Sequence, residues 1–359
     1  MPAITPGSHV LVSGASGYIA AWTCQLLLER GFKVRGTVRS KEKGDYLSNQ
    51  FEKFGEKWSY AIVEELTSPS GFDEAIKGID GVAHIASPFH YKMTDPYKDY
   101  IEPAVNGTLS ILKSANGPNG ESVKRIVITS SLGAIARPRS GASELDEVAH
   151  VITEADWNEE CPKLVKEKGS ETPAFDAYCA SKTLAEKAAW EFVEEEKPKF
   201  DLVTICPPYN FGPVIHQVTS ANSLNTSVKA FYEYLVGIGD IEALKRPSGY
   251  VVDVRDVATA HIQALVVEQA GGKRYGVSER RFSWQETLDV IHSHNHHQYW
   301  PKAPIGTPGL GKTLAARQPL FDASKVCREL GLEYRPFETT ILDMSSSLYA
   351  LFKKWDTQS

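Results

Sequence analysis

The residues with the clearest chemical potential are Tyr178 and Lys182, which stand four positions apart in the segment AYCASK. Residues with this spacing lie on one face of a helix, so the phenol and the ammonium group would be neighbours. A nearby cation stabilises a phenolate, which predicts that Lys182 lowers the pKa of Tyr178 toward neutral pH. Such a pair could hand a proton to a carbonyl oxygen. The spacing alone is weak evidence, because it also occurs on ordinary helices.

Two serines, Ser130 and Ser131, follow the apolar segment 125–129, which we predict to be a buried strand. In an open parallel sheet, ligands bind at the carboxyl ends of the strands. A serine hydroxyl at that edge could hydrogen-bond a substrate carbonyl. A strand-end serine followed by Tyr178 and Lys182 is therefore far more specific than any one of these residues.

A glycine-rich turn follows the apolar segment 10–12 and precedes a helical pattern that ends at Gly31. We expect Gly14 to form the tight turn and Gly17 to let the backbone approach a pyrophosphate. The free N–H groups and the dipole of a helix N-terminus favour such an anion. The alternative is a purely structural turn. The predicted cofactor contacts are Gly14, Ala15, Ser16, Gly17, Tyr18 and Ile19.

The second predicted strand covers 33–38, and the residues that follow it indicate which nicotinamide cofactor is bound. An NAD site usually places an acidic residue there to hold the ribose 2′-hydroxyl. This chain has Arg39 and, one turn further, Lys43. A guanidinium group matches the oxygens of a 2′-phosphate, so we expect NADPH rather than NADH. The alternative is a solvated basic loop.

Strand and helix patterns alternate as far as Cys206, which predicts an α/β fold with a doubly wound parallel sheet. Prolines and glycines become more frequent after Pro207, and the helices are separated by loops. We therefore predict a Rossmann domain over 1–207 and a smaller substrate lobe over 208–359, with some segments returning to the sheet. Predicted strands are 10–12, 33–38, 60–63, 81–85, 125–129 and 202–206, and predicted helices include 72–77, 97–114, 178–196, 226–235, 257–268 and 338–354.

Composition limits the classes of partner. The 359 residues are 42% hydrophobic and carry a formal net charge of −6, which argues against nucleic acid or an anionic membrane as a partner. The five cysteines are scattered, which suits a reducing compartment. We see neither a leader segment nor an apolar run that could span a bilayer. We expect a cytoplasmic monomer or homodimer that acts on a small molecule.

Taken together, these motifs resemble those of the extended short-chain dehydrogenases/reductases. The match is greatest with the fungal NADPH-dependent aldehyde and ketone reductases, a group related to dihydroflavonol reductases. The spacing G-x-x-G-x-x-A at Gly14, rather than G-x-G-x-x-G, is typical of this family. Other matching segments include 34–43, 86–89, 103–108, 177–192, 207–213, 249–261, 277–279 and 304–311.

The resemblance implies a catalytic triad of Ser131, Tyr178 and Lys182, with Ser131 preferred to Ser130. Tyr178 would donate the proton, Lys182 would hold the nicotinamide ribose, and Ser131 would polarise the carbonyl. Further implied cofactor contacts are Glu65 and Leu66 near the adenine, Pro207 beside the nicotinamide and Ser227 near the phosphates, with helix capping as the alternative for Ser227. Asn106 would support a water near Lys182 through backbone contacts, with simple helix-to-loop hydrogen bonding as the alternative. Substrate-lining candidates are Phe89, Leu132, Tyr209 and Phe211, each of which could instead be a core residue.

The function that the resemblance implies is NADPH-dependent reduction of aldehydes and ketones to alcohols. Two alternatives stay open: an NAD-dependent sugar-nucleotide epimerase or dehydratase of the same fold, and a non-catalytic NADP(H)-sensing protein. Two other patterns carry no function by our interpretation. The segment 306–313 fits the P-loop pattern but lacks a preceding strand, and the histidines of 292–297 lack the separate elements that a metal site needs.

Overall fold

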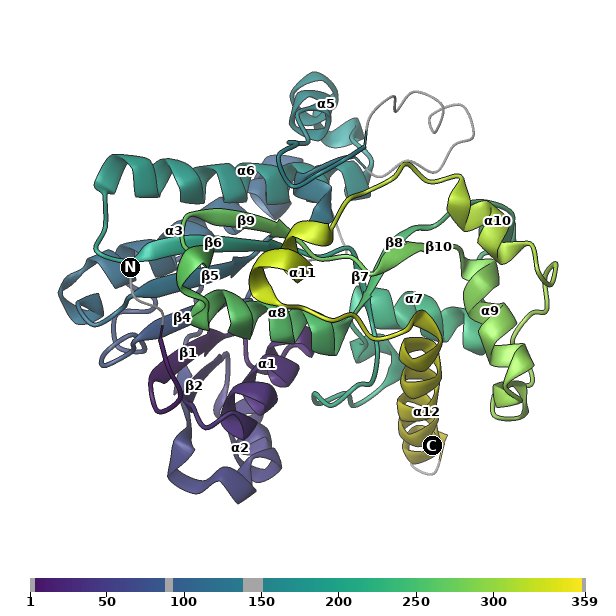
Figure 1. Cartoon of the computed structure of the whole chain (residues 1–359), viewed down its shortest axis with the longest axis horizontal. Coiled ribbons are helices and arrows are strands. Elements are labelled where there is room, and N and C mark those ends of the chain that lie inside the picture. Colours follow the sequence, from purple (N-terminus) through teal and green to yellow (C-terminus); the bar gives the residue numbers. More distant parts are fainter. Residues whose placement is uncertain (1–3, 88–92, 138–150, 357–359) are drawn as a thin grey trace.

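The structure is a computed structural model that describes residues 4–87, 93–137 and 151–356. Its centre is a seven-stranded parallel sheet in the order β3-β2-β1-β4-β5-β6-β9 (Figure 1). This order confirms the predicted doubly wound fold. The strands are β1 (His9–Ser13), β2 (Lys33–Val38), β3 (Trp58–Ile62), β4 (Gly81–His84), β5 (Arg125–Thr129), β6 (Asp201–Cys206) and β9 (Lys273–Gly276).

Helices cover both faces of this sheet, as continuous apolar strands require. On one face α1 (Tyr18–Glu29) packs against α8 (Val254–Val266), and on the other α3 (Glu102–Asn116) packs against α6 (Ala174–Glu196). A separate apolar cluster fills the space on each side. In the described part of the chain, no helix is both long and apolar enough to cross a membrane. The remaining helices beside the sheet are α2 (Lys41–Gln50), α5 (Glu160–Lys168) and α11 (Ser324–Leu330).

A second, three-stranded sheet in the order β10-β8-β7 lies beside the first and is built from residues after Pro207. Helices from the same part of the chain surround it (Figure 1). Its core is rich in aromatic rings, with Phe211 and Phe282 edge to face at a centroid distance of 5.4 Å. The elements are β7 (Tyr209–Phe211), β8 (Gly249–Asp253), β10 (Arg280–Phe282), α7 (Thr226–Leu235), α9 (Trp284–Ser293), α10 (Gly311–Ala316) and α12 (Phe337–Asp356).

The predicted helix at 72–77 is wrong, because this segment consists of consecutive turns. Its backbone makes short-range bonds, such as Asp73 N–H to the Ser70 carbonyl, and the positive φ of +69° at Gly78 ends it. Phe72 and Ile76 are nevertheless fully buried. The helical spacing of the apolar residues thus indicates their burial correctly. The turns are held from outside, because the Ser114 hydroxyl of α3 donates to the Asp73 carboxylate and the Asn119 amide donates to the Asp73 carbonyl.

Tyr18, at the start of α1, joins the two parts of the molecule. Its hydroxyl donates a hydrogen bond of 2.6 Å to the carbonyl of Gly212, and its ring packs into the aromatic core of the second sheet. One turn later, the indole N–H of Trp22 donates to the carbonyl of Pro213 at 2.8 Å. The helix that follows the glycine turn is therefore anchored to the segment after β7.

We expect Tyr18→Phe to lower the free energy of unfolding by about 1–2 kcal/mol, because the variant leaves the buried Gly212 carbonyl without its donor. Chemical denaturation measures this change. Tyr46→Phe, at an exposed position on α2, is the control and should change stability by less than about 0.5 kcal/mol. Equal stability of the two variants would show that the Tyr18 bond does not hold the lobes together.

Candidate active site

The turn after β1 has a geometry that only glycine adopts without strain. Gly14 has a φ of +65°, and a Cβ placed on it would lie 3.0 Å from the Cβ of Ala86. The loop is held from the neighbouring strand, because the Ala15 N–H donates to the Thr37 carbonyl at 2.9 Å. Because Gly14 has no side chain, a pyrophosphate could approach the backbone of this turn closely.

The N-terminus of α1 is suited to an anion. Gly17 is the N-cap residue of this helix, and no described side chain bonds to the free N–H groups of the helix N-terminus. The first turn of the helix contains no acidic residue. Tyr18 can contribute to such a site only through its backbone, since its hydroxyl is bonded to Gly212. These features fit the pyrophosphate of a dinucleotide.

The basic residues after β2 lie at the surface. Arg39 and Lys43 are both exposed, with Lys43 in the first turn of α2. Glu65 is also exposed, and its carboxylate accepts bonds from the Thr67 hydroxyl at 2.6 Å and the Thr67 N–H at 3.0 Å. These bonds, with a smaller effect of the Arg39 charge, lower the pKa of Glu65. The neighbouring Leu66 is buried in the core, so this pair could offer an adenine mainly an apolar contact.

Ser131, Tyr178 and Lys182 come together on the wall of a cleft of about 1060 Å³. Ser131 begins a short helical turn, Leu132–Ala134, and its oxygen accepts the Gly133 N–H at 3.0 Å. The Ser131 hydroxyl is near enough to the Tyr178 phenol to act on its pKa. The structure therefore places both hydroxyls where one carbonyl oxygen could reach them.

Ser130 is directed elsewhere. Its hydroxyl donates a 2.5 Å bond to Oε2 of Glu186, which is buried on α6. Adjacent residues at the end of a strand point to opposite sides, so only one of the two serines can face the cleft. That residue is Ser131.

The predicted lowering of the Tyr178 pKa is wrong for this structure. Burial raises the pKa to about 12, the nearby Cys179 adds to this, and only the hydrogen bond with Ser131 acts in the opposite direction. The Lys182 ammonium lies 5.8 Å from the centre of the Tyr178 ring. At this distance the loss of water around a phenolate outweighs the attraction of the cation.

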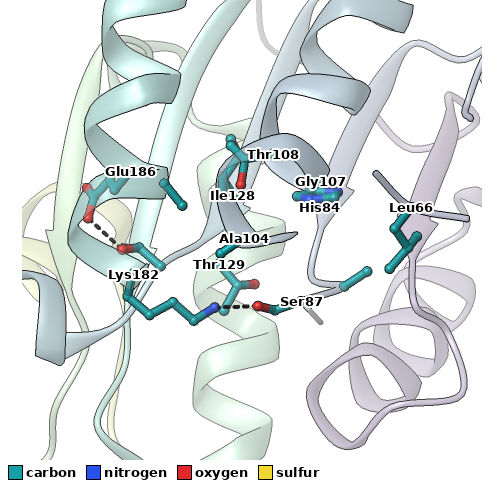
Figure 2. Close-up of a pocket in the computed structure, with 13 residues that line it drawn as sticks. Leu66, His84, Ser87, Ala104, Gly107, Thr108, Ile128, Thr129, Lys182 and Glu186 are labelled. Atoms are coloured by element: carbon teal, nitrogen blue, oxygen red, sulfur yellow. Dashed lines mark hydrogen bonds between the residues drawn. The ribbon is translucent and has the colours of Figure 1, made fainter. Parts of the chain in front are cut away.

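Lys182 is buried and extends from α6 toward β4, as Figure 2 shows. Its Nζ donates a 3.0 Å bond to the hydroxyl of Ser87, and burial lowers its pKa to about 8. Behind it is a small cavity that His84, Thr108 and Thr129 help to line. The imidazole of His84 is also buried, which lowers its pKa to about 3, so it is neutral at pH 7.

Among the substrate-lining candidates, Leu132 and Tyr209 line the cleft. The assignment of Phe211 is wrong, because its side chain is fully buried in the aromatic core of the second sheet. Phe89 lies outside the described residues. Tyr209 and Phe211 are two positions apart on β7 and share one face of the strand, and both contact Phe282. Only Tyr209 reaches the cleft.

The other predicted contacts occupy distinct places. Ser227 lines the cleft in the first turn of α7, whereas Pro207 is buried and its carbonyl accepts the Leu132 N–H at 2.9 Å. Asn106 is solvent-exposed on α3. Its support of a water through backbone contacts stays a prediction.

Several lining residues were not found from the sequence. Phe175 stands three positions before Tyr178, and their rings stack at 6.1 Å between centroids, so helical periodicity could have indicated it. Residues from the second sheet and its loops had no local signal, because their position depends on how the lobes pack. These are Tyr250, Trp284 and Phe321.

Neither of the two remaining patterns forms a ligand site in the described structure. In the P-loop-like segment, the N–H groups of Thr307 and Gly309 donate to side chains of α9, and a loop rather than a strand precedes them. His294 pairs with Glu338 at 2.7 Å, although no acid is near it in sequence. Among the described residues, no group of three His, Cys, Asp or Glu side chains could hold a metal ion.

Comparisons with known proteins show the family to which the chain belongs. The model of the NAD dependent epimerase/dehydratase family matches residues 10–277. The chain is 36% identical to the putative NADPH-dependent methylglyoxal reductase of Candida albicans, over 95% of this chain and 98% of that protein. It is 35% identical to the NADPH-dependent methylglyoxal reductase of Saccharomyces cerevisiae, over 94% and 97%. The crystal structure of yeast methylglyoxal/isovaleraldehyde reductase complexed with NADPH is similar at a TM-score of 0.82 and 33% identity, over 97% of this chain and 99% of that chain. These findings confirm the resemblance.

The buried Lys182 should make stability depend on pH. Because its pKa is lowered from 10.5 to about 8, the unfolded chain binds a proton in this range that the folded chain does not. The contribution of Lys182 to stability therefore rises between about pH 8 and 10.5, by roughly 3 kcal/mol. We expect this rise in the wild type and in Lys166→Met, an exposed control, and its loss in Lys182→Met. Denaturation curves at several pH values test it, and parallel curves for Lys182→Met and the wild type would contradict it.

Proposed function

Because the chain belongs to the NAD dependent epimerase/dehydratase family and its relatives include NADPH-dependent reductases, we propose that it is an NADPH-dependent reductase of aldehydes and ketones. The observation that carries the proposal is the pair of neighbouring hydroxyls, Ser131 and Tyr178, which line one cleft beside the buried Lys182. This pair opens onto a cleft whose walls are mostly apolar, as a carbonyl compound with an apolar body requires.

NADPH, when bound, supplies the hydride for the carbonyl carbon. The Ser131 and Tyr178 hydroxyls would both donate to the carbonyl oxygen, where negative charge develops. The Tyr178 Oη would then give its proton to that oxygen and leave an alcohol. Lys182, with its ammonium on the same face of α6, would stabilise the phenolate that remains.

The raised pKa of Tyr178 suits this direction of the reaction. A phenol with a pKa of about 12 keeps its proton at neutral pH and is available as an acid. An alkoxide is more basic still, so the proton moves downhill as the carbonyl oxygen becomes charged. Deprotonation of Lys182, whose pKa is about 8, would remove the cation that stabilises the product phenolate.

The cofactor contacts in this proposal follow the strand ends. The backbone of the turn at Gly14 and the free N–H groups at the N-terminus of α1 would hold the pyrophosphate. Arg39, with Lys43 beyond it, would bind the 2′-phosphate, and their exposure leaves both free to reach a ligand at the surface. Ser227 would contact the phosphates from the opposite wall of the cleft.

The proposal also includes the expected organisation of the molecule. We propose a cofactor domain over 1–207 and a substrate lobe over 208–359, in which α8, β9 and α11 return to the large sheet. A cytoplasmic monomer or homodimer remains our expectation from composition. An NAD-dependent epimerase or dehydratase is less consistent with Arg39, and a non-catalytic sensor would not need the Ser131–Tyr178 pair.

We expect Tyr178→Phe to lower kcat for carbonyl reduction by about 10²–10⁴-fold, because the variant lacks the proton donor. Its dissociation constant for NADPH should stay within about threefold of the wild type. NADPH oxidation with methylglyoxal and larger aldehydes and ketones measures the first quantity, and fluorescence titration measures the second. Full turnover by the variant would remove Tyr178 from the mechanism, and a wild type that binds NADPH but reduces no carbonyl would favour the sensor.

We expect Arg39→Ala to raise KM for NADPH by about tenfold or more and to change KM for NADH little, because only NADPH carries the 2′-phosphate that the guanidinium group would bind. A tenfold change corresponds to about 1.4 kcal/mol of binding free energy. Lys57→Ala, an exposed cation away from the end of β2, serves as the matched control. Unchanged preference for NADPH in Arg39→Ala would assign the 2′-phosphate to another residue.

A further inference from the structure

A buried arginine that belongs to none of the sequence motifs contacts the surroundings of the active site. Arg274 is in the edge strand β9 and is only 8% exposed. Its Nε donates to Glu186 at 2.7 Å, and its Nη2 donates to Glu186 at 3.1 Å and to the Ala134 carbonyl at 3.1 Å. Its Nη1 donates to the carbonyls of Glu154 and Asp156, at 3.0 and 2.5 Å. All five N–H donors of the guanidinium group are thus used.

These acceptors belong to three segments that meet at the cleft. Glu186 is on α6, one turn after Lys182. Ala134 ends the short turn that Ser131 begins. Glu154 and Asp156 belong to the segment 151–159, which forms one wall of the cleft. The guanidinium plane also lies 3.8 Å from the ring centre of Trp157 in this wall.

The Glu186 carboxylate extends the connection to the catalytic serine. It accepts a 2.5 Å bond from the hydroxyl of Ser130 and a 2.7 Å bond from the hydroxyl of Thr204 on β6. Figure 2 shows Glu186 and Lys182 extending from the same helix. Its dashed lines mark the hydrogen bond that the Glu186 carboxylate accepts from Ser130 and the one that Lys182 donates to Ser87. The residue bonded to Glu186 therefore immediately precedes Ser131.

We propose that Arg274 is a positioning residue for carbonyl reduction: through its ion pair with Glu186, its guanidinium group aligns the Ser131 turn and the cleft wall 151–159 with the helix that carries Tyr178 and Lys182. This inference rests on the proposed function. A buried charge with five directed bonds has a single low-energy arrangement, so it holds its partners in fixed relative places. Displacement of a reacting group by about 1 Å can cost about 10²-fold in rate.

The fold contains a matched arginine that has no contact with the cleft. Arg125, at the first residue of β5, is fully buried and also uses five donors. Two go to Asp201, at 2.7 and 2.9 Å, and three go to carbonyls that follow α8 or end it. It lies at the amino ends of the strands, opposite to the edge that holds Ser131. Its replacement removes a similar network without touching the active site.

The test compares Arg274→Lys with Arg125→Lys. A lysine keeps the charge but has three donors and no planar fork, so each variant loses part of its network and both should unfold at a lower temperature. We expect Arg274→Lys to raise KM for the carbonyl substrate by about tenfold and to lower kcat by about threefold to tenfold. Arg125→Lys should leave both within about twofold. Equal kinetics for two folded variants would overturn the proposal.

A second variant covers the case in which Arg274→Lys does not fold. Glu186→Gln keeps the shape of the carboxylate but removes a negative charge that raises the pKa of Lys182. The alkaline limb of its kcat profile should therefore move to lower pH. It should also increase hydrogen exchange of the amides in 151–159 relative to the wild type, which needs no turnover. Unchanged exchange and an unchanged pH profile would overturn the proposal, whereas a wild type without reductase activity but with protected 151–159 amides would count against the proposed function alone.

Discussion

Seven parallel strands bring their carboxyl ends to the same edge of one sheet, and three of the predicted site segments directly follow strands at that edge. The glycine turn at Gly14 follows β1, Arg39 follows β2, and Ser131 follows β5. A parallel strand pair needs a crossover, and the helix of each crossover covers a face of the sheet. Helix α6 is one such crossover, between β5 and β6, and this topology places Tyr178 and Lys182 next to Ser131.

Burial controls the electrostatics of this edge. The pKa of Tyr178 rises to about 12, that of Lys182 falls to about 8 and that of His84 falls to about 3, in each case chiefly because the charged form loses water. Exclusion of water from such a site also strengthens hydrogen bonds and ionic interactions with negative charge that develops on a substrate oxygen. A phenol that stays protonated at neutral pH is the resting state that the acid role proposed for Tyr178 requires.

Two buried arginines, Arg125 and Arg274, connect the strands of the large sheet to the segments around them, and each uses all five N–H donors. Arg125 ties the amino ends of β5 and β6 to the end of α8 and the segment after it, while Arg274 ties the carboxyl side to the cleft wall and α6. The second sheet closes the cleft from the other side, and Tyr18 connects it to the glycine turn. The glycine turn, α6 and the cleft wall 151–159 therefore belong to one connected framework, although they come from distant parts of the chain.

Local patterns in the sequence were sufficient for the sheet, the glycine turn and the spacing of Tyr178 and Lys182, because these depend on residues within a few turns or strands of one another. They could not exclude Phe211 from the cleft, reverse the expected pKa shift of Tyr178 or show that Ser130 bonds to Glu186. They also gave no sign of Arg274, whose partner Glu186 is 88 residues away. Burial and long-range bonds arise only when distant segments pack, and no local spacing records them.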